Sequence, residues 1–226
     1  MSDIKRVVSI GAHSLDAEIL GGPIMLKYAA DGAHCTYIHV TQGRLEDPDA
    51  TEEAKRVYLQ ELLEQNQRAA GKLNGDTIWL GYVSNNMPSL EEFSARMEQY
   101  FVEEKVDLVI THWRGSMHPR HINTHDAVTA AVKRLREKGS SIRLVYGENF
   151  EDLVGFIPQA YFKLEPQELE QWFAGLREYS VFCGIINDFP YQDYYSTIGK
   201  VRQIESNNDG FTVGYMYASL IENKLW

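Results

Sequence analysis

The sequence contains little that would place it in a membrane or on a nucleic acid. No apolar run approaches the ~20 residues that a membrane-spanning helix needs, and the first residues show no signal-peptide core. Acidic residues outnumber basic ones by 32 to 22, which gives a formal net charge of −10. Nucleic acids and anionic membranes attract basic surfaces. We therefore expect a cytoplasmic protein whose partner is a small molecule, with no nucleic acid and no membrane.

Cysteine is scarce, and one common glycine motif is missing. The two cysteines, Cys35 and Cys183, cannot form a disulfide framework, and neither has the spacing of a nucleophile or a metal ligand. We expect each to behave as a small buried apolar residue. The first predicted strand ends in Gly11-Ala12-His13 rather than in a Gly-x-Gly-x-x-Gly loop, which argues against dinucleotide binding.

The pattern that is present is an alternation of strand and helix. With 226 residues, 44% of them hydrophobic, the chain is the right size for one domain over residues 1–226. Short β-branched runs predict strands at 6–10, 36–40, 77–80, 107–111 and 142–146. Helices are expected at 17–30, 51–73, 90–104, 124–138 and 167–182. This order predicts an α/β fold, a Rossmann-like and mostly parallel sheet with helices on both faces.

The last 44 residues follow a less regular pattern. Strands are expected at 201–205 and 212–217, and Asn207-Asn208-Asp209-Gly210 between them is a strong turn signal. We therefore predict an irregular C-terminal hairpin extension. The aromatic segment 189–195 fits a substrate mouth, a contact within a homo-oligomer or ordinary core packing equally well.

Polar side chains follow several of the predicted strands. In parallel sheets, ligands bind outside the carboxyl ends of the strands. The polar residues at these ends are His13 and Asp16, then Arg44, then His112 and Arg114, then Glu148. We interpret Arg44, His112, Arg114 and Glu148 as candidate substrate-binding residues. A plain surface position remains the alternative for each arginine.

Two of these strand ends carry histidine clusters that suggest a metal site. His13, Asp16 and His121 would supply two imidazole nitrogens and one carboxylate oxygen to Zn²⁺, although such sites also bind other divalent ions. Water on a catalytic zinc has a pKa of about 7 and can attack a carbonyl. His118 would protonate the leaving amine or stabilise the oxyanion.

The remaining histidines have simpler interpretations. We expect His125 to be a solvated helix residue, and we expect His34 and His39 to be structural. An unrelated α/β protein with coincidental histidines is the alternative to the whole metal-site hypothesis.

Two signatures in this order resemble the PIG-L/LmbE-like family of zinc-dependent N-deacetylases. Residues 12–18, Ala-His-Ser-Leu-Asp-Ala-Glu, are similar to the family's Ala-His-Pro-Asp-Asp run, and residues 118–121, His-Pro-Arg-His, to its His-Pro-Asp-His run. Residues 148–152, Glu-Asn-Phe-Glu-Asp, resemble a later Glu-Asn-Trp-Glu-Asp run. The resemblance implies removal of an acyl group from an N-acylated amino sugar or its conjugate. It also implies zinc on His13, Asp16 and His121, with His118 as acid or oxyanion partner.

Two positions depart from the family pattern. Leu15 stands where the family has its general base, an Asp, and a leucine cannot accept a proton. Arg120 stands where an Asp would orient the acid histidine, and its positive charge should make His118 harder to protonate.

Three explanations of Leu15 compete. Another carboxylate could serve as base; Glu18, Glu46, Asp47 and Glu148 are the candidates by position. Zinc alone could sustain a slower hydrolase, since losing a general base costs ~10²–10⁴-fold in rate. Alternatively, the chain is a catalytically impaired relative that binds a metal and a ligand. The retained ligand set and His118 favour hydrolysis.

Overall fold

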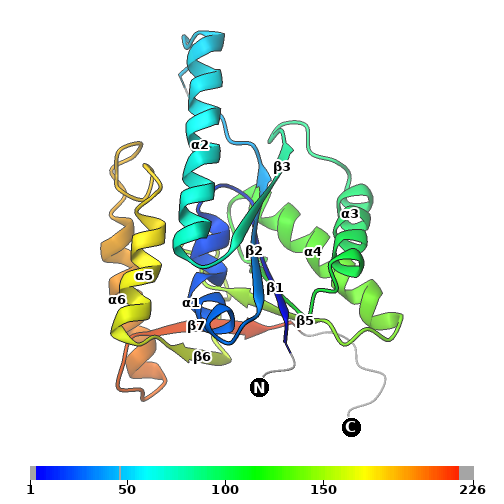
Figure 1. The fold of residues 1–226 in the computed structure, drawn as a ribbon, viewed down its shortest axis with the longest axis vertical. Coiled ribbons are helices and arrows are strands. Elements are labelled where there is room, and N and C mark those ends of the chain that lie inside the picture. Colours follow the sequence, from blue (N-terminus) through cyan, green and yellow to red (C-terminus); the bar gives the residue numbers. More distant parts are fainter. Residues whose placement is uncertain (1–3, 46, 219–226) are drawn as a thin grey trace.

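The computed structural model describes residues 4–45 and 47–218. Its centre is a seven-stranded sheet. The strands are β1 Arg6–Gly11, β2 His34–Thr41, β3 Asp76–Tyr82, β4 Leu108–His112, β5 Arg143–Gly147, β6 Ala160–Lys163 and β7 Thr212–Tyr217. Their order across the sheet is β3-β2-β1-β4-β5-β7-β6 (Figure 1). The first five are mutually parallel, and β7 runs antiparallel to both β5 and β6.

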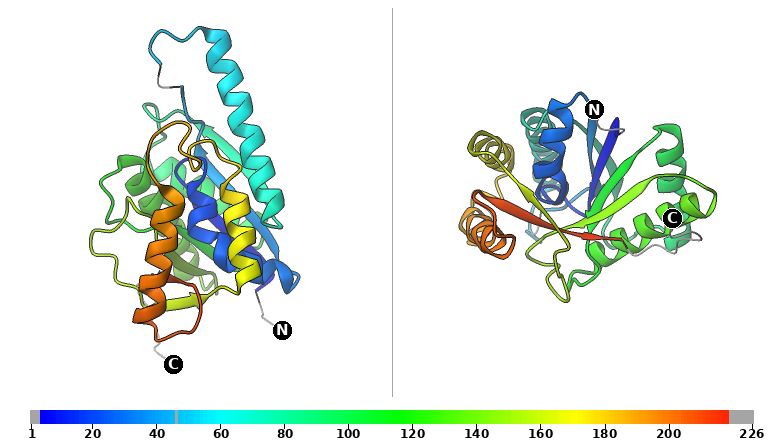
Figure 2. Two further views of the ribbon diagram at one scale, coloured as in Figure 1. Left: turned by 90° about the vertical axis from the view of Figure 1, so that its left-hand side faces the viewer. Right: turned by 90° about the horizontal axis from the view of Figure 1, so that it is seen from below.

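Helices cover both faces of this sheet, as the alternation of elements predicts. They are α1 Asp16–Ala30, α2 Glu52–Lys72, α3 Leu90–Glu103, α4 Pro119–Glu137, α5 Pro166–Leu176 and α6 Tyr191–Glu205. One face carries α1, α2, α5 and α6, and the other carries α3 and α4 (Figures 1 and 2). The predicted α/β class and mostly parallel sheet are therefore confirmed.

The central strands are apolar on both sides because each side faces helices. In β1, Val7 belongs to the core under α1 and α5, while Val8 and Ile10 belong to the core under α3 and α4. All three are buried. Side chains alternate between the two faces of a strand, so a strand between two helical layers reads as a continuous apolar run.

Helix α4 begins five residues earlier than the sequence predicts, which matters for the site. Pro119 occupies its first turn, and the His118 side chain accepts a hydrogen bond from the backbone N–H of Arg120 as the N-cap. Proline suits the first turn because the N–H that it lacks has no partner inside the helix there. His118 and His121 are therefore held by a helix start rather than by a loop.

The predicted C-terminal hairpin is wrong. Residues 201–205 form the last turn of α6, so they do not pair with β7, which lies between β5 and β6 and pairs with both of these strands. The buried residues of α6 recur at helical intervals, at Tyr191, Tyr195, Gly199 and Arg202. Ile204, which favours a strand in the sequence, is 80% exposed on that helix. Helical periodicity over the whole segment therefore outweighs the local β-branched signal.

The two cysteines occupy different environments. Cys35 is buried in β2, as predicted, whereas Cys183 is exposed after α5, so its predicted burial is wrong.

In the ranges that the structure covers, no helix combines the length and the apolar character needed to cross a bilayer.

Candidate metal centre

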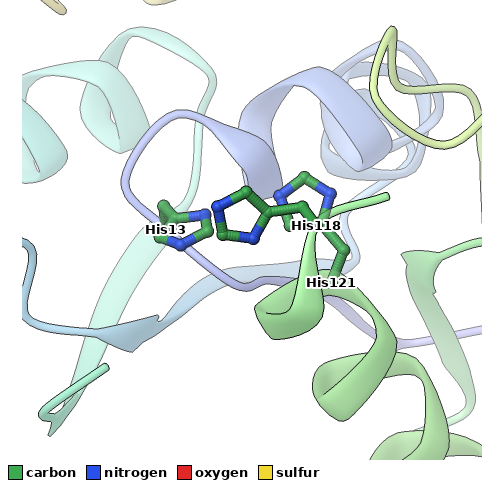
Figure 3. Close-up of side chains that lie close together, drawn as sticks. All are labelled: His13, His118 and His121. Carbon is green, nitrogen blue, oxygen red and sulfur yellow. The ribbon is translucent and has the colours of Figure 1, made fainter. Parts of the chain in front are cut away.

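Four histidines and one aspartate meet where β1 and β4 end. His13 comes from the turn between β1 and α1, and Asp16 begins α1. His112 ends β4, and His118 and His121 come from the start of α4. Figure 3 shows the imidazoles of His13, His118 and His121 gathered at that helix start. Two sets of three side chains each offer donor atoms that lie within 4.8 Å of one another inside the set. One is His13, His118 and His121, and the other is Asp16, His112 and His121.

Asp16 lies at the centre of the second set. Its Oδ2 is 3.4 Å from His121 Nε2 and 3.1 Å from His13 Nδ1. The same oxygen accepts a hydrogen bond from the backbone N–H of His13 at 2.9 Å. The Asn149 amide donates to Oδ1 at 3.1 Å. Burial favours the neutral carboxyl, yet the neighbouring imidazoles, His121 foremost, hold the pKa of Asp16 well below its usual value. The carboxylate is thus fixed in its ionised, metal-binding form.

Asp152, which the sequence analysis did not single out, supports two of the histidines. Its Oδ2 lies 2.7 Å from His112 Nδ1 and its Oδ1 lies 2.7 Å from His121 Nδ1. Burial would lower the pKa of His121, but the carboxylates of Asp16 and Asp152 outweigh it and raise that pKa to about 10. The Glu-Asn-Phe-Glu-Asp run was the only sequence signal that included this residue, and it assigned no role to it.

His112 is engaged through both ring nitrogens. Its Nε2 accepts a hydrogen bond from the Ala12 N–H at 2.9 Å, so its proton lies on Nδ1, which donates to Asp152. The residue is completely buried. His112 is therefore a buried member of the cluster that supports the β1–α1 turn through its bond with Ala12.

His118 lies at the open side of the cluster. Its ring centre is 4.6 Å from that of His13 and 4.8 Å from that of His121. Burial, followed by the neighbouring imidazoles, lowers the pKa of His118 to about 4. The expected difficulty of protonation is present, but its cause differs from the expected one: the Arg120 guanidinium is turned to Asn123.

Glu151 is a second residue that the sequence analysis did not single out. Its Oε2 lies 3.5 Å from His121 Nε2, and its side chain is 37% exposed. Burial raises the pKa of Glu151, against the lowering effect of His121. A half-exposed carboxylate therefore faces the same His121 nitrogen as Asp16 does.

The donor set fits a divalent metal. His121 Nε2 is buried and has no hydrogen-bond partner, while its Nδ1 is held by a carboxylate. This arrangement is typical of histidines that bind zinc, because the partner on one nitrogen orients the other toward the ion. Imidazole nitrogens and a carboxylate oxygen are the ligands that zinc accepts.

Leu15 turns away from this cluster. It is 4% exposed and packs in the core on the α1 face of the sheet. Its backbone has φ 85° and ψ −36°, in the left-handed region that a branched side chain rarely adopts. Both the chemistry and the position of a base are therefore absent at residue 15.

Three of the four carboxylates considered as replacement bases lie within the described residues, and their environments differ. Glu18 is completely buried, with Oε1 3.3 Å from His39 Nε2. Glu148 is buried and bound by the guanidinium of Arg202. Asp47 is exposed and accepts a hydrogen bond from the Asp49 N–H, and Glu46 lies outside the described residues.

The remaining predicted residues take the following places. Arg44 is exposed, and Arg114 is exposed and paired with Asp126 at 2.8 Å.

His39 is buried, with Nδ1 3.3 Å from the His13 carbonyl, and His34 is exposed at the other end of β2. His125 is buried, with Nδ1 2.9 Å from the His112 carbonyl, so its predicted solvation is wrong.

Comparison with known proteins relates the chain to one family. The family model for GlcNAc-PI de-N-acetylase, PIG-L, matches residues 8–132. The chain is 24% identical over 187 residues to a mycothiol S-conjugate amidase of Streptomyces coelicolor. That match includes 71% of this chain, which spans 63% of the length of the relative.

Two solved structures share the fold. A deacetylase of the teicoplanin biosynthesis pathway has a TM-score of 0.72 at 18% identity, with 95% of this chain and 99% of that chain covered. GalB, the 4-carboxy-2-hydroxymuconate hydratase from Pseudomonas putida, has a TM-score of 0.77 at 13% identity, with 98% and 100% covered.

Proposed function

The chain belongs to the GlcNAc-PI de-N-acetylase family, and from this premise we propose that it is a metal-dependent amidohydrolase. Its substrate would be a small N-acylated molecule, an amino sugar or its conjugate with an N-acetyl group first among the candidates. One observation carries the proposal. The buried and unpartnered Nε2 of His121 faces Asp16 Oδ2 at 3.4 Å, at the carboxyl ends of β1 and β4.

We propose that His13, Asp16 and His121 hold the metal, with Zn²⁺ as the first candidate. His112 is not included, because its Nε2 already accepts the Ala12 N–H. A divalent ion at this position would polarise a substrate carbonyl and make water acidic enough to react near neutral pH. Asp152 would keep the ring of His121 turned toward the ion, since it is hydrogen-bonded to Nδ1.

His118 would act on the carbonyl oxygen. Its Nδ1 accepts the Arg120 N–H, so its ring proton remains on Nε2. With a pKa of about 4, the ring is neutral at pH 7. A neutral imidazole donates a hydrogen bond to a developing oxyanion, which favours the oxyanion role over that of a general acid.

Substrate recognition stays a prediction, as do several features of the whole protein. We propose Arg44 and Arg114 as contacts to substrate hydroxyls because both are exposed. Burial and existing partners argue against the same role for His112 and Glu148. The cytoplasmic location, a single domain over residues 1–226 and a homo-oligomer also remain predictions.

The proposal is tested by pairing metal content with amine release. The purified protein would be loaded with Zn²⁺ and assayed for free amine on a panel of N-acetylated amino sugars, with and without a chelator. Zinc near one per chain, with release that the chelator abolishes, is expected. Zinc without release on any substrate would instead favour the impaired, ligand-binding relative. No zinc binding would contradict the proposed metal site.

A second candidate function is metal-assisted hydration of a carbon–carbon double bond. Two observations favour it: the family's base position is occupied by Leu15, and the fold matches a hydratase over 98% of this chain. Hydration adds water without releasing an amine. Loss of ultraviolet absorbance with a panel of unsaturated carboxylic acids would reveal it, and absorbance that stays constant would exclude it for that panel.

A further inference from the structure

Amide hydrolysis requires a group that takes a proton from the attacking water, and residue 15 does not provide one. Leu15 is aliphatic and packs into the core. The replacement must therefore be a carboxylate or imidazole that reaches both the cluster and the solvent, since substrate and water enter from outside. His118 does not provide one either, because its Nδ1 accepts the Arg120 N–H and its Nε2 therefore carries the ring proton.

The buried carboxylates do not meet this requirement. Glu18 lies behind the metal cluster, completely buried near His39. Glu148 is held by Arg202, which contacts both of its carboxylate oxygens. A base must exchange protons with water during each turnover, and neither carboxylate is open to it.

Glu151 meets both conditions. Its Oε2 is 3.5 Å from His121 Nε2, the nitrogen that also faces Asp16, and more than a third of its side chain is exposed. Among the described residues, the carboxylates of Asp16, Asp152 and Glu151 contact the histidines of the cluster. Asp16 and Asp152 already have other roles, which leaves Glu151.

The backbone around Glu151 is held in place on several sides. Its backbone N–H donates to Asn149 Oδ1 at 3.1 Å, and the Asn149 side chain in turn donates from Nδ2 to Asp16 Oδ1. Asp152, the next residue, binds His112 and His121. Phe150, the preceding residue, stacks on Phe189 with ring centres 4.4 Å apart. A catalytic group needs such support, because a displacement of about 1 Å costs much of the rate.

We propose that Glu151 is the general base of the reaction, an inference that rests on the proposed amide hydrolysis. The Glu151 carboxylate takes a proton from water while the water oxygen bonds to the carbonyl carbon, and the carbonyl π electrons move onto the oxygen that His118 stabilises. When the C–N bond then breaks, the proton passes from Glu151 to the leaving nitrogen. One amide and one water give one carboxylic acid and one amine.

A carboxylate at this distance could serve instead as an additional metal ligand. The two roles differ in a measurable way. A ligand contributes to metal affinity, whereas a base that does not bind the ion leaves the affinity nearly unchanged and lowers kcat. Metal affinity is therefore measured alongside activity, by equilibrium competition of Zn²⁺ with a chromophoric chelator.

The main comparison is Glu151→Gln against Glu104→Gln. Glu104 has a similar exposure of 42% but pairs with Arg6 at the start of β1, at the opposite end of that strand from the cluster. We expect Glu151→Gln to lower kcat by ~10²-fold or more, with KM and zinc affinity within about twofold. Glu104→Gln should match the wild type in all three quantities.

A rescue experiment adds a second test. Leu15→Asp in the Glu151→Gln background restores a carboxylate at the family's usual position, and Leu15→Asn is its control without a base. Both short polar residues tolerate the left-handed backbone at this site better than leucine does. We expect neither variant to gain activity, because the side chain at residue 15 packs into the core. A tenfold gain from the aspartate alone would contradict the placement of residue 15 on which the choice of Glu151 rests.

Each outcome decides the proposal. An active wild type with an equally active Glu151→Gln would overturn the role of Glu151 while leaving the proposed function intact. A variant that loses zinc affinity together with activity would make Glu151 a ligand and not a base. A wild type that binds zinc and releases no amine would remove the proposed function, and this inference with it.

Discussion

Asp152 binds two histidine rings with one carboxylate, so its loss should disturb both of them. We predict that Asp152→Asn weakens Zn²⁺ binding by ~10–100-fold, because an amide cannot accept from both rings and His121 loses its orientation. Competition with a chromophoric chelator measures the affinity. Asp126→Asn is the control, because it alters a half-buried carboxylate on the same helix as His121 that pairs with Arg114 instead of with the cluster. Equal affinities in the two variants would contradict this role.

The two cysteines should differ sharply in reactivity. Burial raises the pKa of Cys35 to about 12, so about one molecule in 10⁴ carries its thiolate at pH 8. Cys183 is exposed. Titration of the native protein with a thiol reagent should therefore show one fast thiol, and the second should react only after unfolding. Cys183→Ser should abolish the fast phase, and a fast phase that persists would contradict this assignment.

The residues of the cluster differ in how far the sequence could reveal them. His13, Asp16, His118 and His121 were predicted from short local motifs at strand ends, and the fold brings them together. Asp152 and Glu151 lie about thirty residues beyond His121. Their place near the cluster depends on the path of the chain after β5, which no local spacing encodes. The internal partners of His112 could not be predicted either, because they depend on tertiary contacts with Ala12 and Asp152.

At the scale of elements, the packing of α1 on β1 depends on a glycine. A Cβ on Gly21 would lie 2.4 Å from Ser9 Cβ, so the helix would have to shift away from the strand. We predict that Gly21→Ala lowers the free energy of unfolding by about 1–3 kcal/mol. Gly71→Ala in α2 meets open space and should raise it by about 0.5–1 kcal/mol. Urea unfolding measures both, and a common sign would contradict the packing argument.

The elements themselves were largely predictable. The five parallel strands and five helices appear close to their expected places because each is apolar on the faces that the sheet and the helices bury. The exception is the stretch 191–205, where Val201 and Ile204 suggest a strand. Its aromatic residues recur at helical spacing, and two of them, Tyr191 and Tyr195, fill the α1-side core. Tertiary packing therefore determines that this segment is a helix. Strand β6 was not predicted, because its four residues are too few to give a periodic signal.

At the scale of the whole molecule, metal binding should stabilise the fold. An ion that binds only the native state at 100 times its Kd adds about 2.7 kcal/mol, which corresponds to a rise in Tm of about 5–10 °C for a chain of this size. We predict this rise on adding Zn²⁺ and its reversal by a chelator. Scanning calorimetry would measure it.

His13→Ala should lose most of the rise, since it removes a proposed ligand. His34→Ala should keep the rise, because His34 lies at the other end of β2 and pairs with Asp76. A rise of equal size in both variants would place the ion elsewhere.

The arrangement of the cluster along the chain has a consequence for how the protein can be divided. His13, Asp16, His118 and His121 all precede the exposed turn at Gly139, where φ is +91° and an added side chain would meet nothing. Glu151 and Asp152, which face or hold the ring of His121, come after it. A chain opened at this turn would yield one fragment with the ligands and another with their carboxylate support. Tight metal binding would then report fragment complementation, because neither half contains the whole arrangement.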